Sequence, residues 1–437
     1  MHKQVAKGIV LSALHAVPDF SRFAMLQNLS DSENEGLLAW LDRSGLALLF
    51  LQQVENYGVA HLLSSQLKNA LEQRLEKNKL RFNDMLQEFG RINQALRERN
   101  IAVCTLKGFS LVPDFCEEPS LRHQTDFDFL VEPKNVEDTA QVLQSFGYST
   151  PHLSKTEESC FITPTSHIPT ERDDIYAVQP QRQIDLHVSV VENSFWVMPE
   201  LPKDFLAHSE PATLARISFS RLSLEDRFLL QVLHFYRHAS RSWIRLSWLF
   251  EIAHCLTAHS SNQDLWRRAI LRAGNSSIAR RIFALVLGLT QRLFQCPISH
   301  SLSVWSNSAM TTSLSTWLDH FSVQWAITDW PGGLTNIFLM QDFIPEQNSR
   351  NQYLRSRLLP RRTQSFLTKP TKKGSRDILR FRSEQIRYVV NRTARHCKNI
   401  GGLSLQWILW KRALHLARRG TSSGPHLELP VGHGGVS

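Results

Sequence analysis

The 437-residue chain has six cysteines but no Cys-x-x-Cys pair. Their scattered spacing excludes the common zinc-binding patterns and indicates no disulfide framework. No apolar run approaches the roughly 18 residues that a membrane-spanning helix needs. Residues 9–17 are apolar, but Ser12 and His15 interrupt them and their spacing is helical, which favours an amphipathic helix over a secretory signal. We therefore expect a cytoplasmic protein with free structural thiols and no transmembrane segment.

Positive charge is concentrated toward the C-terminal end. The formal net charge is +10, yet residues 350–420 hold 19 Lys and Arg against two acids, a net charge of +17. This basic arm could contact an anionic partner: nucleic acid, a membrane surface or a phosphorylated substrate. Alternatively, it is a solvated helical face that packs on the acidic remainder of the chain. Both interpretations remain open at the level of sequence.

The order of apolar patterns predicts an α+β protein with a small mixed β-sheet and helices at both ends. Apolar residues at helical spacing between Leu67 and Leu96 predict a long amphipathic helix that ends near Asn100. Short apolar, β-branched stretches predict strands at 101–106, 126–131, 176–178 and 183–190, with a helix at 136–146. We expect a helical N-terminal region (1–100), an α/β core (101–222), a helical region (223–345), a basic helical arm (346–420, with helices at 378–390 and 405–417) and a disordered tail (421–437).

Two aspartates, Asp126 and Asp128, lie one residue apart in an otherwise apolar expected strand. Residues i and i+2 of a strand share a face, so both carboxylates project together while Phe127 and Phe129 turn toward a core. Two carboxylates roughly 6 Å apart repel by about 3 kcal/mol at an effective dielectric near 20. A cation between them would remove this cost, and Mg²⁺ suits a few carboxylate oxygens with water and phosphate as its other ligands. The alternative is two solvated acids on an exposed sheet face.

A third carboxylate, Asp185, lies in the expected strand 183–190. If that strand neighbours the first, three acids meet at one site, as in two-metal centres, with Asp185 as a base or a metal bridge. Alone, it could be an acid at a sheet edge.

Lys107, Gly108 and Ser110 lie where the strand at 101–106 would turn into a helix at 109–115. A glycine there lets the backbone approach phosphate, and a helix N-terminus offers free N–H groups. The segment is not a P-loop, because Lys precedes Gly and no second glycine has the required spacing. Arg122 could bind phosphate oxygens or could pair with the nearby aspartates.

The histidines carry a weaker signal. His187 would share a strand face with Asp185. His234 and His238 are four residues apart, which permits metal binding on one helix face, but no third ligand is evident and packing beside Trp243 is favoured. His167 lies in a polar loop and could contact substrate.

The motifs occur in a characteristic order. They are Leu106-Lys107-Gly108, Arg122 with 126–131, Gly147-Tyr148, Ile184–His187, and His234 and His238 followed by 243–251. Together they resemble the polymerase β-type nucleotidyltransferase superfamily, and more closely the bacterial uncharacterised nucleotidyltransferase family, over roughly Trp40 to Leu256. The chain departs from the usual pattern in reading Gly108-Phe109-Ser110 where Gly-Ser is common, in the longer gap to Asp126, and in Glu251 where Asp is common.

The resemblance implies that Asp126 and Asp128 form a catalytic, metal-binding pair, with Asp185 as the third acid. It also implies that Gly108 and Ser110 form the phosphate-side turn, which Lys107 and Arg122 would flank. The implied reaction is Mg²⁺-dependent transfer of a nucleoside monophosphate, AMP from ATP or the equivalent from another nucleoside triphosphate, to an acceptor. The acceptor could be a small molecule, a sugar, a protein or RNA. The alternative is a catalytically inactive protein of this fold that binds nucleic acid or an anionic partner through residues 350–420.

Overall fold

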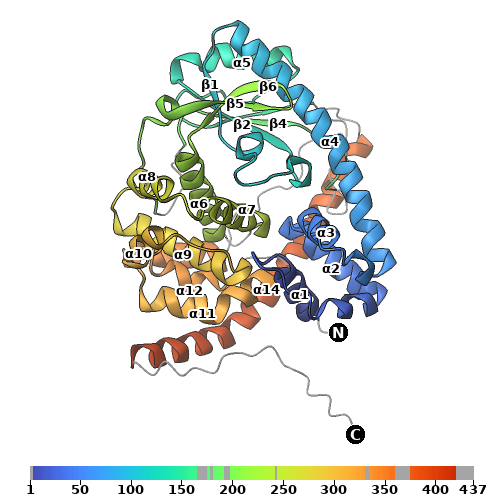
Figure 1. Cartoon of the computed structure of the whole chain (residues 1–437), viewed down its shortest axis with the longest axis vertical. Coiled ribbons are helices and arrows are strands. Elements are labelled where there is room, and N and C mark those ends of the chain that lie inside the picture. Colours follow the sequence, from blue (N-terminus) through green and yellow to red (C-terminus); the bar gives the residue numbers. More distant parts are fainter. Residues whose placement is uncertain are drawn as a thin grey trace.

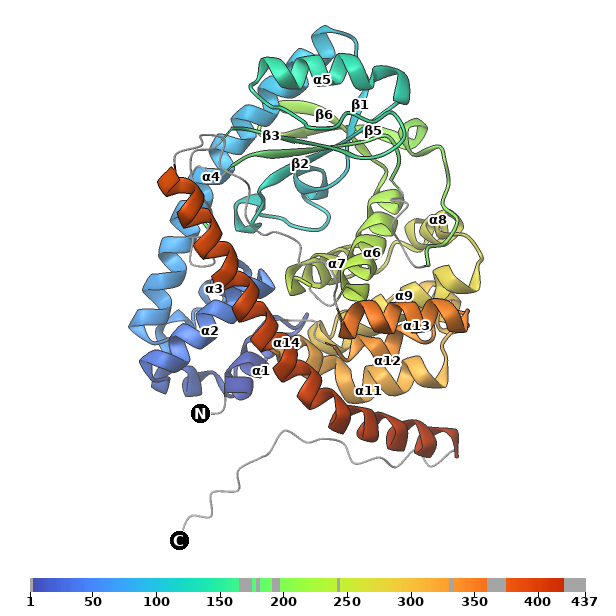
Figure 2. The same ribbon diagram turned by 180° about the vertical axis from the view of Figure 1, so that it is seen from behind.

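The structure is a computed structural model that describes residues 3–164, 175–177, 181–190, 197–241, 244–329, 334–359 and 375–419. His167, Trp243 and the tail at 421–437 lie outside these residues. Figures 1 and 2 show a β-sheet at one end of the molecule and two groups of helices beneath it, one from the N-terminal part of the chain and one from the later part. The α+β class expected from the sequence is confirmed.

The N-terminal helices are α1 (Lys3–Ala13), α2 (Asp31–Ser44), α3 (Ala47–Asn56) and α4 (Ser65–Glu98). Helix α1 is the amphipathic helix expected near the N-terminus, although it begins earlier, and it buries Ile9 and Val10. Helix α4 ends before Asn100, which has a positive φ of 56° and so interrupts helical geometry. The long helix and its stop are confirmed.

Helix α4 contributes to two separate cores. Leu67 and Leu71, near its start, pack in the core that also holds the other N-terminal helices and the later helical region. Phe89 and Ile92, near its end, pack in a second core against the sheet. A single 34-residue helix therefore connects the helical end of the molecule to the sheet (Figure 1).

The sheet has six strands in the order β3-β4-β2-β1-β6-β5. Their bounds are β1 Val103–Thr105, β2 Asp126–Val131, β3 Ser159–Ile162, β4 Gln183–His187, β5 Ser209–Leu214 and β6 Ile217–Leu222. Strand β2 pairs in parallel with β4 and antiparallel with β1, so the sheet is mixed as expected. Helices α4 and α5 (Val136–Ser145) pack on one face, where Phe127 and Phe129 are buried.

The strand expected at 176–178 was wrong for the residues that are described there. Tyr176 lies in a turn, and Val178 is outside the described residues. The carbonyls of Ile175 and Ala177 accept hydrogen bonds from the buried Arg81 of α4 instead of from a neighbouring strand. The guanidinium of Arg81 thus supplies the hydrogen bonds that a neighbouring strand would supply in a sheet, and the side chain of Tyr176 in the turn is buried.

The later helices form a bundle below the other sheet face (Figure 1). They are α6 Leu224–Ser240, α7 Leu246–Ala258, α8 Gln263–Ala273, α9 Ser277–Phe294, α10 His300–Asn307, α11 Thr312–Ile327, α12 Asn336–Met340 and α13 Gln347–Leu358. Helix α14 (Ser375–Arg418) runs across the N-terminal helices and the bundle (Figure 2). It replaces the two separate helices expected in the arm, because no proline interrupts the polar stretch between them. Within the described ranges, no helix combines the length and apolar character needed to cross a bilayer.

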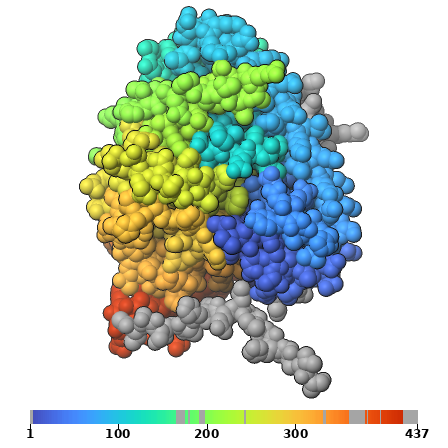
Figure 3. Space-filling view, viewed as in Figure 1, coloured from blue at the N-terminus to red at the C-terminus, as the bar shows by residue number. Residues whose placement is uncertain are grey.

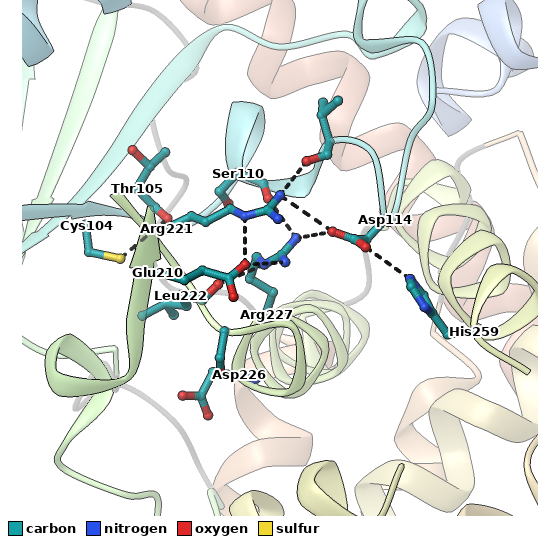
Figure 4. A network of polar contacts seen from close by, with 12 residues as sticks. Cys104, Thr105, Ser110, Asp114, Glu210, Arg221, Leu222, Asp226, Arg227 and His259 are labelled. Carbon is teal, nitrogen blue, oxygen red and sulfur yellow. Dashed lines mark hydrogen bonds and ion pairs between the residues drawn. The ribbon is translucent and has the colours of Figure 1, made fainter. Parts of the chain in front are cut away.

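A buried polar network joins the bundle to the sheet (Figure 4). Arg227 of α6 is 1% exposed and donates to the carbonyls of Leu222 and Ser110, at 2.9 and 3.0 Å. Its guanidinium also binds Asp114 at 2.8 Å and Glu210 at 3.2 Å. Burial alone would raise the pKa of Asp114, but Arg227 and the neighbouring Arg221 hold it below its usual value. Arg227 of α6 therefore fixes the position of the segment that follows β1 through its contacts with Ser110 and Asp114.

Replacing Arg227 by Met should lower the free energy of unfolding by about 3–5 kcal/mol, because two carboxylates would lose a buried partner. Urea unfolding measures the change. Arg267→Met is the matched control: Arg267 is 72% exposed and pairs with Asp264 on its own helix, so its loss should cost less than about 0.5 kcal/mol. Equal losses in the two variants would contradict a structural role for the buried arginine.

Candidate functional site

The three aspartates singled out from the sequence lie on one face of two neighbouring strands. Strand β2 carries Asp126 and Asp128, and parallel strand β4 carries Asp185 directly opposite Asp128 in register. Alternation places these side chains on the sheet face opposite the phenylalanine core. Asp128 is almost fully buried at 4% exposure. The structure therefore brings the three acids together, and two buried phenylalanines set the direction in which the first two point.

Two basic side chains contact Asp128. Lys107 lies two residues after the end of β1, and its Nζ atom is 2.6 Å from Asp128 Oδ1. His187 lies at the end of β4, with Nε2 3.1 Å from the same oxygen and Nδ1 3.5 Å from Glu158. Lys107, which was expected to flank the phosphate-side turn, thus also binds one of the three aspartates. Glu158 was missed, because nothing in the sequence marks an acid in the loop before β3 as a neighbour of the site.

The protonation of the acids is uneven. Burial, and next the charge of Asp128, raise the pKa of Asp126 to about 6. Burial also raises the pKa of Asp185, with Asp128 as the second cause. Burial would do the same to Asp128, but Lys107 and His187 outweigh it and hold its pKa well below the usual range. Asp128 is therefore ionised, whereas the charged forms of Asp126 and Asp185 are disfavoured.

The turn at Gly108 lies against this strand. Gly108 has a φ of +59°, and a Cβ there would lie 2.3 Å from Nε2 of Gln124. That amide nitrogen donates to the carbonyl of Asp126 at 2.8 Å. Only glycine fits between the turn and the amide, since a side chain would be both strained and obstructed. Gln124, which sequence reasoning missed, links the turn to the acidic strand.

The segment after Gly108 differs from the expected helix at 109–115. It forms a single 3₁₀ turn, Gly108–Leu111, because Pro113 restricts Val112 to extended backbone. Ser110 within the turn is fully buried, and its hydroxyl has no hydrogen-bond partner in the described part of the chain. The helix N-terminus that would have faced phosphate is therefore not formed by this segment.

Arg122 has a carboxylate partner outside the aspartate group. Its Nε donates to Oε1 of Glu251 on α7 at 2.8 Å, and Gln231 of α6 donates to the other oxygen at 2.7 Å. Burial lowers the pKa of Arg122, but the charges of Glu251 and, next, Asp126 outweigh it. The arginine is thus held by α7 and still lies within the electrostatic influence of Asp126. Glu251 ends the helical motif of the sequence, and this contact accounts for an acid at that position.

A cavity of about 150 Å³ adjoins this arginine. Helix α3 contributes Gln52 and Asn56 to its lining, and α7 contributes Trp248 and Glu251. The remaining walls come from the chain before β2. In Figure 3 the cyan surface that follows β1 lies between the blue N-terminal helices and the green and yellow surface of later segments. The cavity is therefore built by all three parts of the fold.

His234 and His238 of α6 pack against the ring of Trp248. Their ring centroids lie 4.6 and 4.4 Å from that of Trp248. The packing beside Trp243 that the sequence favoured lies outside the described residues. Burial, and next Arg237, lower the pKa of His238 to about 3, so it is neutral at physiological pH.

Metal binding would need ligands beyond the side chains of the protein. No group of three or more His, Cys, Asp or Glu side chains is placed to hold a metal within the described ranges. A metal ion bound by the aspartates of β2 would therefore take further ligands from water or substrate, as Mg²⁺ commonly does.

Asp126 generates a pH-dependent prediction for the metal-free protein. Its folded pKa is raised from 3.8 to about 6, so the folded protein holds its proton more tightly than the unfolded chain and loses stability as pH rises through this window. Asp126→Asn should therefore unfold at a higher temperature than wild type above pH about 6 in EDTA. The difference should shrink toward pH about 4. A difference that is constant over this range would show that the carboxyl is not perturbed.

Comparison with known proteins adds a family. Residues 30–295 match the family described as uncharacterised nucleotidyltransferase. No curated protein and no solved structure matches the chain. The matched segment runs from the N-terminal helices through the sheet, with its three aspartates, to the end of α9. Because it covers more than half of the chain, the protein belongs to the uncharacterised nucleotidyltransferase family.

Proposed function

We propose that the protein transfers a nucleoside monophosphate, AMP from ATP, to an acceptor hydroxyl in a Mg²⁺-dependent reaction that releases pyrophosphate. The family supports nucleotidyl transfer in general. The observation that supports the finer proposal is the convergence of Asp126, Asp128 and Asp185 on one face of β2 and β4. Asp126 and Asp128 would hold the ion, which would neutralise charge on the triphosphate and its leaving group. These residues fit a hard cation, because burial and, next, the charge of Asp128 raise the pKa of Asp126, and a positive charge nearby would stabilise both carboxylates.

The remaining side chains have separate roles in this proposal. Burial alone would lower the pKa of Lys107, but the surrounding aspartates raise it, so the side chain keeps its positive charge. Lys107 would approach a phosphate oxygen of the substrate. Asp185 would accept the proton of the acceptor hydroxyl, because its raised pKa makes it a better base than an ordinary aspartate. Arg122, fixed by Glu251, would position the substrate from the side of the cavity. Catalysis would then consist mainly of positioning and charge neutralisation.

Binding of the proposed substrate can be tested by thermal unfolding. Mg-ATP should raise the melting temperature of the wild-type protein, and Asp126→Ala with Asp128→Ala should abolish the shift. The matched control is Asp264→Ala with Asp319→Ala, two carboxylates that are 70% and 52% exposed and lie far along the chain on α8 and α11. The control should keep the full shift. A shift that survives in the Asp126 and Asp128 double variant would remove the nucleotide site from β2.

Transfer itself can be tested with labelled nucleotide. The protein, Mg²⁺ and ATP labelled at the α-phosphate are incubated with cell extract, and the products are separated and identified by mass spectrometry. An AMP adduct that forms with wild type and fails to form with Asp185→Asn would support both the reaction and the third acid. The same adduct in equal yield with Asp185→Asn would exclude that residue as the base. ATP labelled at the γ-phosphate serves as the control: adding the protein should produce no γ-labelled adduct beyond those that the extract forms without it.

A further inference from the structure

The last part of α14 is attached to the helical bundle by one apolar side. Leu403, Trp407, Trp410 and Leu414 follow helical spacing along this side. Trp410 is 1% exposed, and its ring stacks on Phe338 of α12 with centroids 5.7 Å apart. Trp407 contacts the same ring at 5.4 Å. These contacts hold the helix on the protein surface and fix which side faces outward.

The outward side of the same segment is apolar as well. Leu405, Ile408, Leu409 and Leu416 lie at i, i+3, i+4 and i+11, and so form a stripe along the helix, here called the outer stripe. Leu405 and Ile408 are each 63% exposed, Leu409 is 51% exposed and Leu416 is 38% exposed. Isolated exposed apolar residues are common, but four along one side of a helix form a continuous surface.

Basic residues lie within this stripe. Arg412 and Arg419 continue its spacing at i+7 and i+14 from Leu405, and both are exposed. Helix α14 as a whole contains ten Lys and Arg against two acids, a net charge of +8. One of those acids, Glu384, forms an ion pair with Arg387 one turn away. The outward side thus combines aliphatic side chains with two arginines, on a helix that carries a strong excess of positive charge.

We propose that the outer stripe of α14 binds an anionic lipid surface, with the helix lying in the plane of the interface. A helix of this kind places its aliphatic side chains at the boundary of the acyl chains and its arginines among anionic headgroups. The proposal concerns the arm alone and does not depend on the nucleotidyl-transfer chemistry.

Two other occupants fit the stripe less well. Nucleic acid would satisfy the arginines, but the exposed leucines and isoleucine would have no favourable contact with phosphates. Of the two tryptophans that could stack on bases, Trp410 is buried, and Trp407 lies between Phe338 and the ammonium group of Lys411. A second copy of this chain would cover the aliphatic side chains but would bring Arg412 and Arg419 of both copies together. An anionic membrane is the occupant that complements both components at once.

Vesicle flotation of the full-length protein tests the proposal. Vesicles of phosphatidylcholine with phosphatidylglycerol should carry the protein to the top of the gradient, whereas vesicles of phosphatidylcholine alone should not. Binding should weaken as salt is raised, because the headgroup attraction is screened. No flotation with the anionic vesicles, or equal flotation with both kinds, would overturn the proposal.

Variants assign the binding to the stripe. Leu405→Ser, Ile408→Ser and Leu409→Ser together should lower partitioning into anionic vesicles by at least about tenfold. Arg412→Ala alone should lower it by about fivefold. The matched control replaces three exposed apolar residues on other helices, Leu80→Ser, Leu271→Ser and Val304→Ser, which are 57%, 72% and 57% exposed, and should bind like wild type.

Three results would count against the lipid surface. The first is wild-type binding by the triple serine variant. The second is tight binding of an RNA or DNA duplex that is lost in the same variant while vesicle binding is not. The third is a concentration-dependent dimer that the variant abolishes. The triple serine variant should keep the Mg-ATP melting shift, because its substitutions lie outside the nucleotide site. A failure of membrane binding can therefore be told apart from a failure of the proposed nucleotidyl transfer.

Discussion

The parallel pairing of β2 with β4 is the constraint on which the site depends. These strands are far apart in the chain, and their register places Asp128 opposite Asp185. The same pairing brings His187 within hydrogen-bond distance of Asp128. A slip of one residue would turn every acid of one strand into the phenylalanine core, so the apolar packing on the α4 face fixes the chemistry of the opposite face.

The surroundings of the acids limit the cost of placing three carboxylates close together. Lys107 pairs with Asp128, whereas burial and the charge of Asp128 raise the pKa values of Asp126 and Asp185. Such an arrangement is less stable than an apolar face would be, which is the usual condition of a site built to receive charge. The helical bundle compensates through Arg227, which holds the segment after β1 at several points (Figure 4).

The sequence predicts those helices and strands whose apolar residues recur at regular spacing. The long helix up to Asn100, the strand Asp126–Val131 and the helix after it have strong apolar periodicity, and each was found close to its expected bounds. The class and the family followed from the same segments. The hairpin of β5 and β6 was not anticipated, because its turn at Ala215 and Arg216 uses two positive-φ residues that carry no asparagine or glycine signal.

Contacts between distant segments were harder to foresee. Glu251 holds Arg122 across more than a hundred residues, and Gln124 fills the space that Gly108 leaves open. Neither partner has a local pattern. The Glu251 contact depends on how α7 packs against the loop before β2, and the Gln124 contact depends on how that loop meets the turn after β1. The clustering of the three acids was expected only on the condition that their strands are neighbours, and the sequence alone does not determine strand order.

The length of α4 has a mechanical consequence. At about 1.5 Å per residue, its 34 residues make a rigid rod of about 50 Å that is embedded in both apolar cores. The N-terminal helices and the sheet cannot rotate relative to one another unless this rod bends. Widening of the cavity to admit a bulky ligand would therefore involve the walls that the N-terminal helices do not form, namely α7 and the segment before β2.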